Sequence, residues 1–208
     1  MASLRGLYPI IDTAACSRAG VRPEALAEAL ARARVAMVQY RHKGPYTREV
    51  FAQAETIGRI LQPAGVRYVI NDRADVALML EAGGIHLGQD DLPPSKVRPM
   101  VGSSLWIGFS THNREQLRAG DGEPVDYLAI GPIYPTGSKE RPDPVVGVEA
   151  LAALRSLTAK PLVAIGGITR ANARAVLDAG ADAVAVISDL LAHDLGARLD
   201  EWLQLTAR

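Results

Sequence analysis

The chain has 208 residues, 48% hydrophobic and 22% charged, so it is long and apolar enough to bury a substantial core. Its 23 Lys and Arg residues balance 23 Asp and Glu residues, and this neutrality argues against broad electrostatic binding of nucleic acid or an anionic membrane. The single cysteine, Cys16, excludes an internal disulfide framework, and no signal-peptide pattern or membrane-spanning apolar run is present, so we expect a soluble cytoplasmic protein.

Short apolar runs and helix-forming segments alternate from one end of the chain to the other. The runs predict strands at residues 7–11, 36–40, 66–70, 85–87, 105–109, 127–130, 162–165 and 183–187. The intervening segments predict helices at residues 22–33, 47–61, 75–81, 95–100, 114–119, 148–157, 171–179 and 190–205.

Eight strand–helix units predict an α/β fold, a compact (β/α)₈ TIM barrel with residues 1–208 as one domain. The strands are continuous apolar runs, as expected when both faces of a parallel sheet are buried. A doubly wound open sheet is the alternative, but no glycine-rich dinucleotide fingerprint follows the first strand.

Polar residues and glycines lie at the end of most of the predicted strands or directly after them. They are Gln39, Arg41 and Lys43; Asn71 and Asp72; Gln89, Asp90 and Asp91; Ser110 and His112; Thr136, Ser138 and Lys139; Gly166, Gly167 and Thr169; and Ser188. In a barrel these positions meet at the carboxyl-terminal rim, where enzymes with this fold keep their active sites. The pattern therefore predicts a site at this rim.

Three basic residues at the rim, Arg41, Lys43 and Lys139, predict a phosphate or pyrophosphate site, because together they can neutralise a multiply charged anion. Asp72 and Asp91 follow neighbouring strands and match the preference of Mg²⁺ for one or two carboxylates plus substrate phosphate oxygens. Their alternative role is at helix ends, and Asp75 and Asp90 compete with them as ligands.

The glycine pair after the seventh strand predicts a second anion site. Gly166 and Gly167 allow backbone N–H groups to approach an anion closely. Ser188 opens a predicted helical segment after the eighth strand, which is the usual position of a phosphate site in barrels. Two anion sites would mean two phosphorylated substrates.

The histidines are assigned smaller roles. Strand alternation predicts that His42 points away from the barrel centre, and His86 is expected to be a hydrogen-bonded core histidine. His112 is expected to cap or support the site, with a role as a base left open. No Ser-His-Asp order or Cys-His pair predicts a covalent nucleophile.

Taken together, these motifs resemble those of the thiamine-phosphate synthase family. In the family's order they are Gln-Tyr-Arg-His-Lys at 39–43, Asn-Asp-Arg-Ala-Asp at 71–75, His-Leu-Gly-Gln-Asp-Asp at 86–91, Gly-Phe-Ser-Thr-His at 108–112, Gly-Pro-Ile-Tyr-Pro-Thr-Gly-Ser-Lys at 131–139, Ile-Gly-Gly-Ile at 165–168 and Ala-Gly-Ala-Asp-Ala at 179–183. The resemblance implies a transferase that joins a hydroxymethylpyrimidine diphosphate to a thiazole phosphate, giving thiamine phosphate and pyrophosphate.

The resemblance also implies residue roles. The implied catalytic residues are Lys139, Arg41 and Ser110, and the implied magnesium ligands are Asp72 and Asp91. The implied pyrimidine diphosphate site is Gln39, Tyr40, Arg41, His42, Lys43, Asn71, Ser110 and Lys139. The implied thiazole phosphate site is Thr136, Gly137, Ser138, Gly167, Ile187 and Ser188.

Two alternatives remain beside the synthase. A thiazole tautomerase has the same barrel but would be expected to lack Lys43, Asp72, Asp91 and Lys139, all of which are present here. A non-catalytic phosphate-binding barrel is the other. The sequence leaves the oligomeric state open, a homo-oligomer included.

Overall fold

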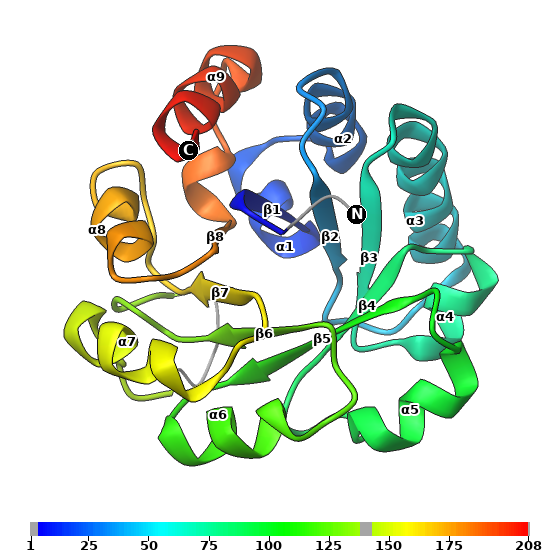
Figure 1. Ribbon diagram of the computed structural model, residues 1–208. Helices are drawn as coiled ribbons and strands as arrows, with labels where there is room; N and C mark the ends of the chain where they lie inside the picture. The colour runs from blue at the N-terminus through cyan, green and yellow to red at the C-terminus, as the bar shows by residue number, and fades with distance from the viewer. Residues whose placement is uncertain (1–3, 138–142, 208) are drawn as a thin grey trace.

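The structure is a computed structural model that describes residues 4–137 and 143–207. Within these ranges eight parallel strands close into a barrel in chain order, each paired with its neighbours in sequence and β8 with β1 (Figure 1). The strands are β1 Gly6–Asp12, β2 Met37–Arg41, β3 Arg67–Asn71, β4 Gly84–Leu87, β5 Trp106–Thr111, β6 Tyr127–Ile130, β7 Leu162–Ile165 and β8 Ala183–Val186. The predicted TIM barrel is confirmed, and the open-sheet alternative is wrong.

Helices form the outer ring around the barrel, as Figure 1 shows. The α-helices are α1 Thr13–Ala19, α2 Pro23–Arg32, α3 Arg48–Leu61, α4 Ala74–Met79, α5 Pro94–Val101, α6 Arg114–Asp121, α7 Val148–Leu154, α8 Ala173–Asp178 and α9 Leu195–Thr206. Short 3₁₀ turns are η1 Gln62–Ala64, η2 Arg155–Leu157 and η3 Ser188–Leu190. Predicted and observed bounds mostly agree within two residues.

The helices differ from the prediction in two places, one omitted helix and one that is divided. The prediction omitted α1, which begins where the Asp12 side chain accepts a hydrogen bond from the Ala15 amide and ends at Gly20 in the left-handed conformation. The predicted helix 190–205 is in fact two segments, η3 and α9. Asp194 separates them, because its carboxylate caps α9 by accepting from the Ala197 amide at 3.0 Å.

Alternate residues of each strand enter two separate apolar layers. In β2, for example, Met37 joins the smaller cluster inside the barrel, whereas Val38 and Tyr40 join the larger cluster between strands and helices. Both layers are almost fully excluded from water, which accounts for the continuous apolar runs in the sequence. The same alternation decides which polar side chains can reach the rim from within the barrel.

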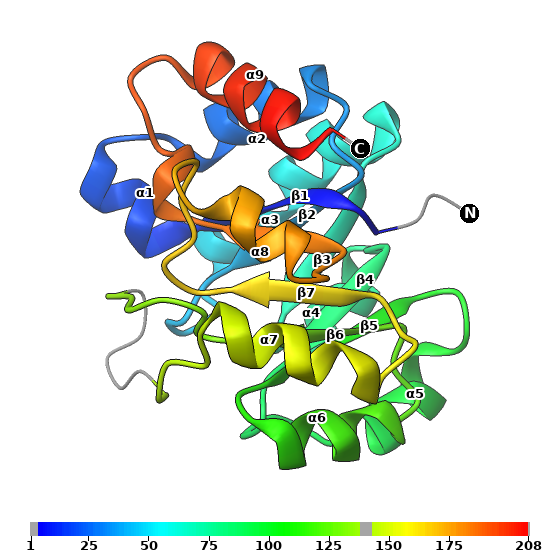
Figure 2. The same cartoon turned by 60° about the vertical axis from the view of Figure 1, so that its left-hand side comes forward.

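The carboxyl ends of the strands all point toward one end of the barrel. In Figure 2, α1 and the chain that follows β6 lie at the end toward which the β7 arrow points. Within the described ranges, no helix has the length and apolarity needed to cross a membrane.

Candidate active site

A lysine and two carboxylates meet at the ends of β2, β3 and β4. The Lys43 ammonium lies 2.6 Å from Asp72 Oδ2, and Asp91 Oδ2 accepts a hydrogen bond of 2.7 Å from the Gly88 amide. Burial raises the pKa of Asp91, an effect that the Gly88 amide opposes and the adjacent Asp72 carboxylate reinforces. Two carboxylates this close repel each other, so the pair favours a cation between or beside them.

The backbone at Asp72 is unusual. Its φ of 64° lies in the left-handed region, which is uncommon for residues other than glycine and clusters at functional sites. Its amide donates to the His86 carbonyl at 2.8 Å, so the turn is tied to β4. This turn directs the Asp72 carboxylate toward Lys43.

The competing carboxylates are placed elsewhere. Asp75 pairs with Arg73 through two of its side-chain oxygens, and Asp90 is exposed. Among the described residues, no group of three or more His, Cys, Asp or Glu side chains is arranged to hold a metal. A pair of carboxylates still fits Mg²⁺, which takes one or two from the protein and completes its shell with water and substrate phosphate.

The end of β2 is anchored by residues that the sequence analysis did not single out. Arg41 forms an ion pair and hydrogen bond with Asp12, which is 4% exposed, and His42 Nδ1 lies 2.9 Å from Thr13 Oγ1. Asp12 thus caps α1 and orients Arg41 at once. The sequence signal that could have indicated this role is the position of Asp12, an acidic residue directly after the first apolar run.

Tyr40 lies on the wrong side of the barrel wall for the role that the resemblance implied. Its ring is fully buried in the layer between strands and helices, and its hydroxyl donates to Gln53 Oε1 of α3 at 3.1 Å. The neighbouring Gln39 points into the barrel instead, where its Nε2 donates to the Tyr8 hydroxyl. The placement of Tyr40 therefore contradicts direct contact with a substrate at the rim, because successive side chains of a strand face opposite ways.

Asn71 and Ser110 line the interior near the rim. Asn71 is 5% exposed, and its side-chain nitrogen has no hydrogen-bond partner among the described residues. A buried donor without a partner is costly, so it marks a place for a ligand acceptor. Ser110 Oγ lies 2.8 Å from His86 Nε2, while the Ser110 carbonyl accepts from Gln89.

His86 is a hydrogen-bonded core histidine, as predicted. Its ring contacts Ser110 through Nε2 and the Tyr127 hydroxyl through Nδ1 at 3.0 Å. Burial lowers the pKa of His86 to about 4; the Asp72 carboxylate opposes this shift to a smaller extent, and the Lys43 ammonium adds to it. The ring is therefore neutral at pH 7.

His112 supports the chain after β6. Its Nδ1 lies 2.7 Å from the Gly131 carbonyl and 3.5 Å from Asp143, and its amide donates to Gln116. These contacts agree with the expected supporting role. The side chain ties β5 to the two ends of the 131–143 segment.

Glycines bring the segments after β6 and β7 into close contact. A Cβ on Gly166 would lie 2.5 Å from Pro132 Cβ, and a Cβ on Gly167 would lie 2.5 Å from the Pro135 carbonyl oxygen. The Tyr134 amide donates to the Gly166 carbonyl at 3.0 Å. Half-buried Thr136 and exposed Gly137 follow directly, whereas Ser138 and Lys139 lie outside the described residues.

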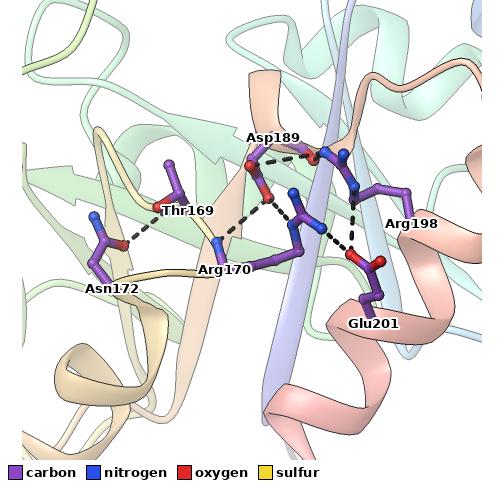
Figure 3. A network of polar contacts seen from close by, with 6 residues as sticks. All are labelled: Thr169, Arg170, Asn172, Asp189, Arg198 and Glu201. Atoms are coloured by element: carbon purple, nitrogen blue, oxygen red, sulfur yellow. Dashed lines mark hydrogen bonds and ion pairs between the residues drawn. The ribbon is translucent and has the colours of Figure 1, made fainter.

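A network of charged side chains fixes the turn after β8 (Figure 3). Arg170 donates to Asp189 from both its backbone and its side chain, and it pairs with Glu201 of α9. Arg198 donates to the Asp189 carbonyl at 2.6 Å. This network holds η3, which begins at Ser188, against the β7 side and α9, while Ile187 packs against the interior cluster.

Asn172 orders the glycine turn on the same side. Its side-chain oxygen accepts from the Thr169 amide at 2.8 Å, a contact drawn in Figure 3. Its nitrogen donates to the Gly167 carbonyl at 3.1 Å. The part of the rim beside β7 and β8 therefore consists of backbone groups whose positions are fixed by side-chain hydrogen bonds. The part beside β2 to β4 consists instead of charged side chains.

Comparison with known proteins identifies the family. A family model described as TMP-TENI, thiamine monophosphate synthase, matches residues 7–190. The chain is 54% identical to the thiamine-phosphate synthase of Koribacter versatilis strain Ellin345, over 82% of this chain and 80% of that one. It is 44% identical to the thiamine-phosphate synthase of Syntrophomonas wolfei, over 84% of each chain.

A solved structure agrees in both fold and name. The thiamine phosphate pyrophosphorylase of Pyrococcus furiosus superimposes with a TM-score of 0.85 at 31% identity, covering 98% of this chain and 96% of that one. The family match spans every strand of the barrel except the first residue of β1. The chain belongs to the thiamine monophosphate synthase family.

Proposed function

We propose that the chain is a thiamine-phosphate synthase that transfers a pyrimidinylmethyl group from a hydroxymethylpyrimidine diphosphate to the ring nitrogen of a thiazole phosphate. The observation that carries this proposal is the cluster of Lys43, Asp72 and Asp91 at one rim, within a family match over residues 7–190. A tautomerase that handles only the thiazole phosphate has no use for such a pyrophosphate site.

The residues at the ends of β2 and β3 hold the pyrimidine diphosphate in this proposal. Arg41 and Lys43, together with Lys139, neutralise the diphosphate, and Asp12 keeps the Arg41 guanidinium in place. Gln39 and Asn71 contact the pyrimidine. The unpartnered nitrogen of Asn71 supports this role, since a substrate acceptor would satisfy it.

The placement of two other residues refines the assignment from the resemblance. Tyr40 is left out because its side chain faces α3, and His42 supports the site through Thr13 and its edge-on packing against Tyr46.

Asp72 and Asp91 would hold Mg²⁺. The bound ion would supply positive charge to the diphosphate as negative charge develops on it. Lys43 already neutralises one oxygen of Asp72, so the protein itself supplies part of the cationic surroundings. Asp75 is excluded as a ligand in this proposal because Arg73 occupies both of its carboxylate oxygens.

The reaction breaks one bond and forms one. The bond between the pyrimidinylmethyl carbon and the diphosphate oxygen breaks, and its electron pair leaves with pyrophosphate. The lone pair of the thiazole nitrogen then bonds to that carbon. No enzyme nucleophile is needed, so catalysis rests on charge stabilisation by Arg41, Lys43 and Lys139 and on the relative positions of the two rings.

The side of the same rim beside β6, β7 and β8 holds the thiazole phosphate in this proposal. The residues assigned to it are Thr136, Gly137, Ser138, Gly167, Ile187 and Ser188. The close packing of Gly167 on the chain after β6 supports this grouping, because it places Thr136 and the glycine turn on one surface. The Arg170 and Asp189 network fixes the backbone that leads into Ser188.

A product assay tests the proposal. Purified protein is incubated with both substrates and Mg²⁺, and thiamine phosphate and pyrophosphate are quantified by chromatography. We expect equimolar products, with turnover strongly reduced in Lys139→Ala and thermal stability almost unchanged. Interconversion of thiazole phosphate tautomers without any coupled product would instead indicate the tautomerase.

A further inference from the structure

A continuous chain of hydrogen bonds crosses the barrel interior beneath the proposed pyrimidine site. It runs from Gln39 Nε2 to the Tyr8 hydroxyl at 3.2 Å, then to the Tyr127 hydroxyl at 2.8 Å. From Tyr127 it continues to His86 Nδ1 at 3.0 Å, and from His86 Nε2 to Ser110 Oγ at 2.8 Å. It therefore joins two residues that are assigned to the same substrate and lie on the non-neighbouring strands β2 and β5.

A glycine on β5 leaves the space that this chain of hydrogen bonds occupies. A Cβ on Gly108 of β5 would lie 2.0 Å from Tyr127 Cζ and 2.3 Å from its hydroxyl oxygen, so only glycine lets the phenol cross toward His86. The Tyr8 and Tyr127 rings also pack edge to face at 5.9 Å between centroids. Apolar residues at the five positions of the chain could fill the same space without any buried polar group, so packing alone does not account for the linked polar groups found here.

The donors and acceptors along the chain fix its direction. The Gln39 amide nitrogen can only donate, so Tyr8 accepts there. Either tyrosine can donate in the 2.8 Å contact between their hydroxyls, and we assign Tyr8 as the donor because its hydrogen would otherwise be buried without an acceptor. Tyr127 accepts from Tyr8 and donates to His86 Nδ1. A neutral His86 then carries its hydrogen on Nε2 and donates it to Ser110 Oγ.

We propose that Tyr8, Tyr127 and His86 are positioning residues that turn the Ser110 hydroxyl into a hydrogen-bond donor toward the pyrimidine diphosphate. Because Ser110 Oγ accepts from His86, its own hydrogen is free to point out of the barrel to an acceptor on the substrate. The same relay holds the Gln39 amide, so the two contacts are set together. This inference rests on the proposed function.

The first test measures the histidine tautomer without any substrate. Protein labelled with ¹⁵N at histidine is examined by NMR at pH 7.5, with the His86 signals identified by their loss in His86→Gln. The expected result is the Nε2–H tautomer. The Nδ1–H tautomer would mean that Ser110 donates into the barrel, and it would overturn the proposal whether or not the enzyme makes thiamine phosphate.

The second test uses two phenylalanine variants that each remove one buried hydroxyl. Tyr127→Phe breaks the relay, whereas Tyr68→Phe removes a hydroxyl that donates to the Ala54 carbonyl at 2.9 Å, outside the relay. We expect Tyr127→Phe to lower kcat about tenfold, the size of one lost hydrogen bond, and to leave KM for the thiazole phosphate within about twofold. Tyr68→Phe should leave both unchanged.

The outcomes separate cleanly. Equal kcat losses in Tyr127→Phe and Tyr68→Phe would show a general cost of lost buried hydroxyls and would refute the relay. If Tyr127→Phe fails to fold, Tyr8→Phe replaces it in the same comparison. If the unmodified protein forms no coupled product, the proposed function fails, while the tautomer measurement still decides the direction of the relay.

Discussion

The Lys43 ammonium and the Asp72 carboxylate lie 2.6 Å apart at the ends of β2 and β3. The proposed diphosphate site, which includes Lys43, is therefore in direct contact with the proposed metal site, which includes Asp72. Asp91 adjoins the pair, and the Asp72 carboxylate helps to raise its pKa. In the proposed assignment, the residue that would bind the anion also neutralises a residue that would bind the cation. This coupling gives variants at the three positions effects of different sign.

Loss of either carboxylate should weaken the use of Mg²⁺. Asp72→Asn and Asp91→Asn are each expected to raise the Mg²⁺ concentration for half-maximal rate by about tenfold, since each removes one of two charged ligands. Asp75→Asn and Asp90→Asn are the matched controls, because Asp75 is paired with Arg73 and Asp90 is exposed. Equal shifts in all four variants would point to general electrostatics and discredit these ligands.

Lys43→Ala should weaken the binding of pyrophosphate without weakening the binding of Mg²⁺. Removing the ammonium frees an oxygen of Asp72, so Mg²⁺ alone should bind at least as tightly as to the unmodified protein. Pyrophosphate in the presence of Mg²⁺ should bind about tenfold more weakly, because one cationic contact is gone. Calorimetric titration of each ion tests this prediction. Weaker binding of both ions would contradict the proposal that Lys43 binds pyrophosphate while competing with Mg²⁺ for Asp72.

The barrel and its rim could be predicted from sequence because they rest on local pattern. Strand runs, helix caps such as Thr47 and the polar residues after each strand all follow from neighbours in the chain. The direction of individual side chains needed the strand register. Gln39 and Tyr40 are adjacent and both polar, yet only Gln39 enters the barrel, which the family resemblance alone did not distinguish.

Residues that act through long-range contacts were missed for the same reason. Tyr8 and Tyr127 are 119 positions apart and read as ordinary core aromatics until the closed barrel brings their hydroxyls together. Asp12 lies one residue beyond the predicted strand 7–11 and was given no role from sequence, although it forms an ion pair with Arg41. Such roles depend on pairing across the sheet, which no local window of sequence contains.

Gly167 should be intolerant of a side chain. Its φ of 64° and the 2.5 Å approach of a Cβ to the Pro135 carbonyl oxygen mean that Gly167→Ala adds both backbone strain and a clash. Gly65→Ala is the matched control, since its φ of 77° brings the strain alone with no atom within 4 Å of a Cβ. We expect a loss of about 1–2 kcal/mol of unfolding free energy in the control and more in Gly167→Ala.

Denaturant unfolding measures this difference, and titration with the thiazole phosphate measures its effect on binding. Only Gly167→Ala should weaken the ligand, because only this change displaces the chain that carries Thr136. Equal losses of unfolding free energy in Gly167→Ala and Gly65→Ala would contradict the prediction, because they would mean that the overlap with Pro135 does not destabilise the protein.

The buried histidine predicts a pH dependence of stability. The pKa of His86 is about 4 in the folded protein and 6.5 when unfolded, so the unfolded chain binds the extra proton first. Its contribution is fully present above pH 6.5 and is lost as the pH falls toward 4, by about 3 kcal/mol in all. Unfolding free energies of the unmodified protein and His86→Gln, compared from pH 7.5 to 4.5, test this. The slope should be shallower in the variant, and parallel curves would contradict the assignment.

A charge at Ser188 tests whether the rim holds two separate anion sites. Ser188 begins η3, whose backbone is fixed by the network around Asp189, and the proposed thiazole phosphate lies against it. Ser188→Asp puts a carboxylate where that phosphate must bind, so binding should weaken by roughly 1–3 kcal/mol. Pyrophosphate with Mg²⁺ should bind almost normally, since the residues proposed to bind it follow β2, β3, β4 and β6.

Ser104→Asp is the control, because it adds the same charge on the turn before β5, at the opposite end of the barrel, and should affect neither ligand. Calorimetric titration of each ligand separates these effects, and equal weakening of both by Ser188→Asp would mean that the two phosphorylated groups share a single site.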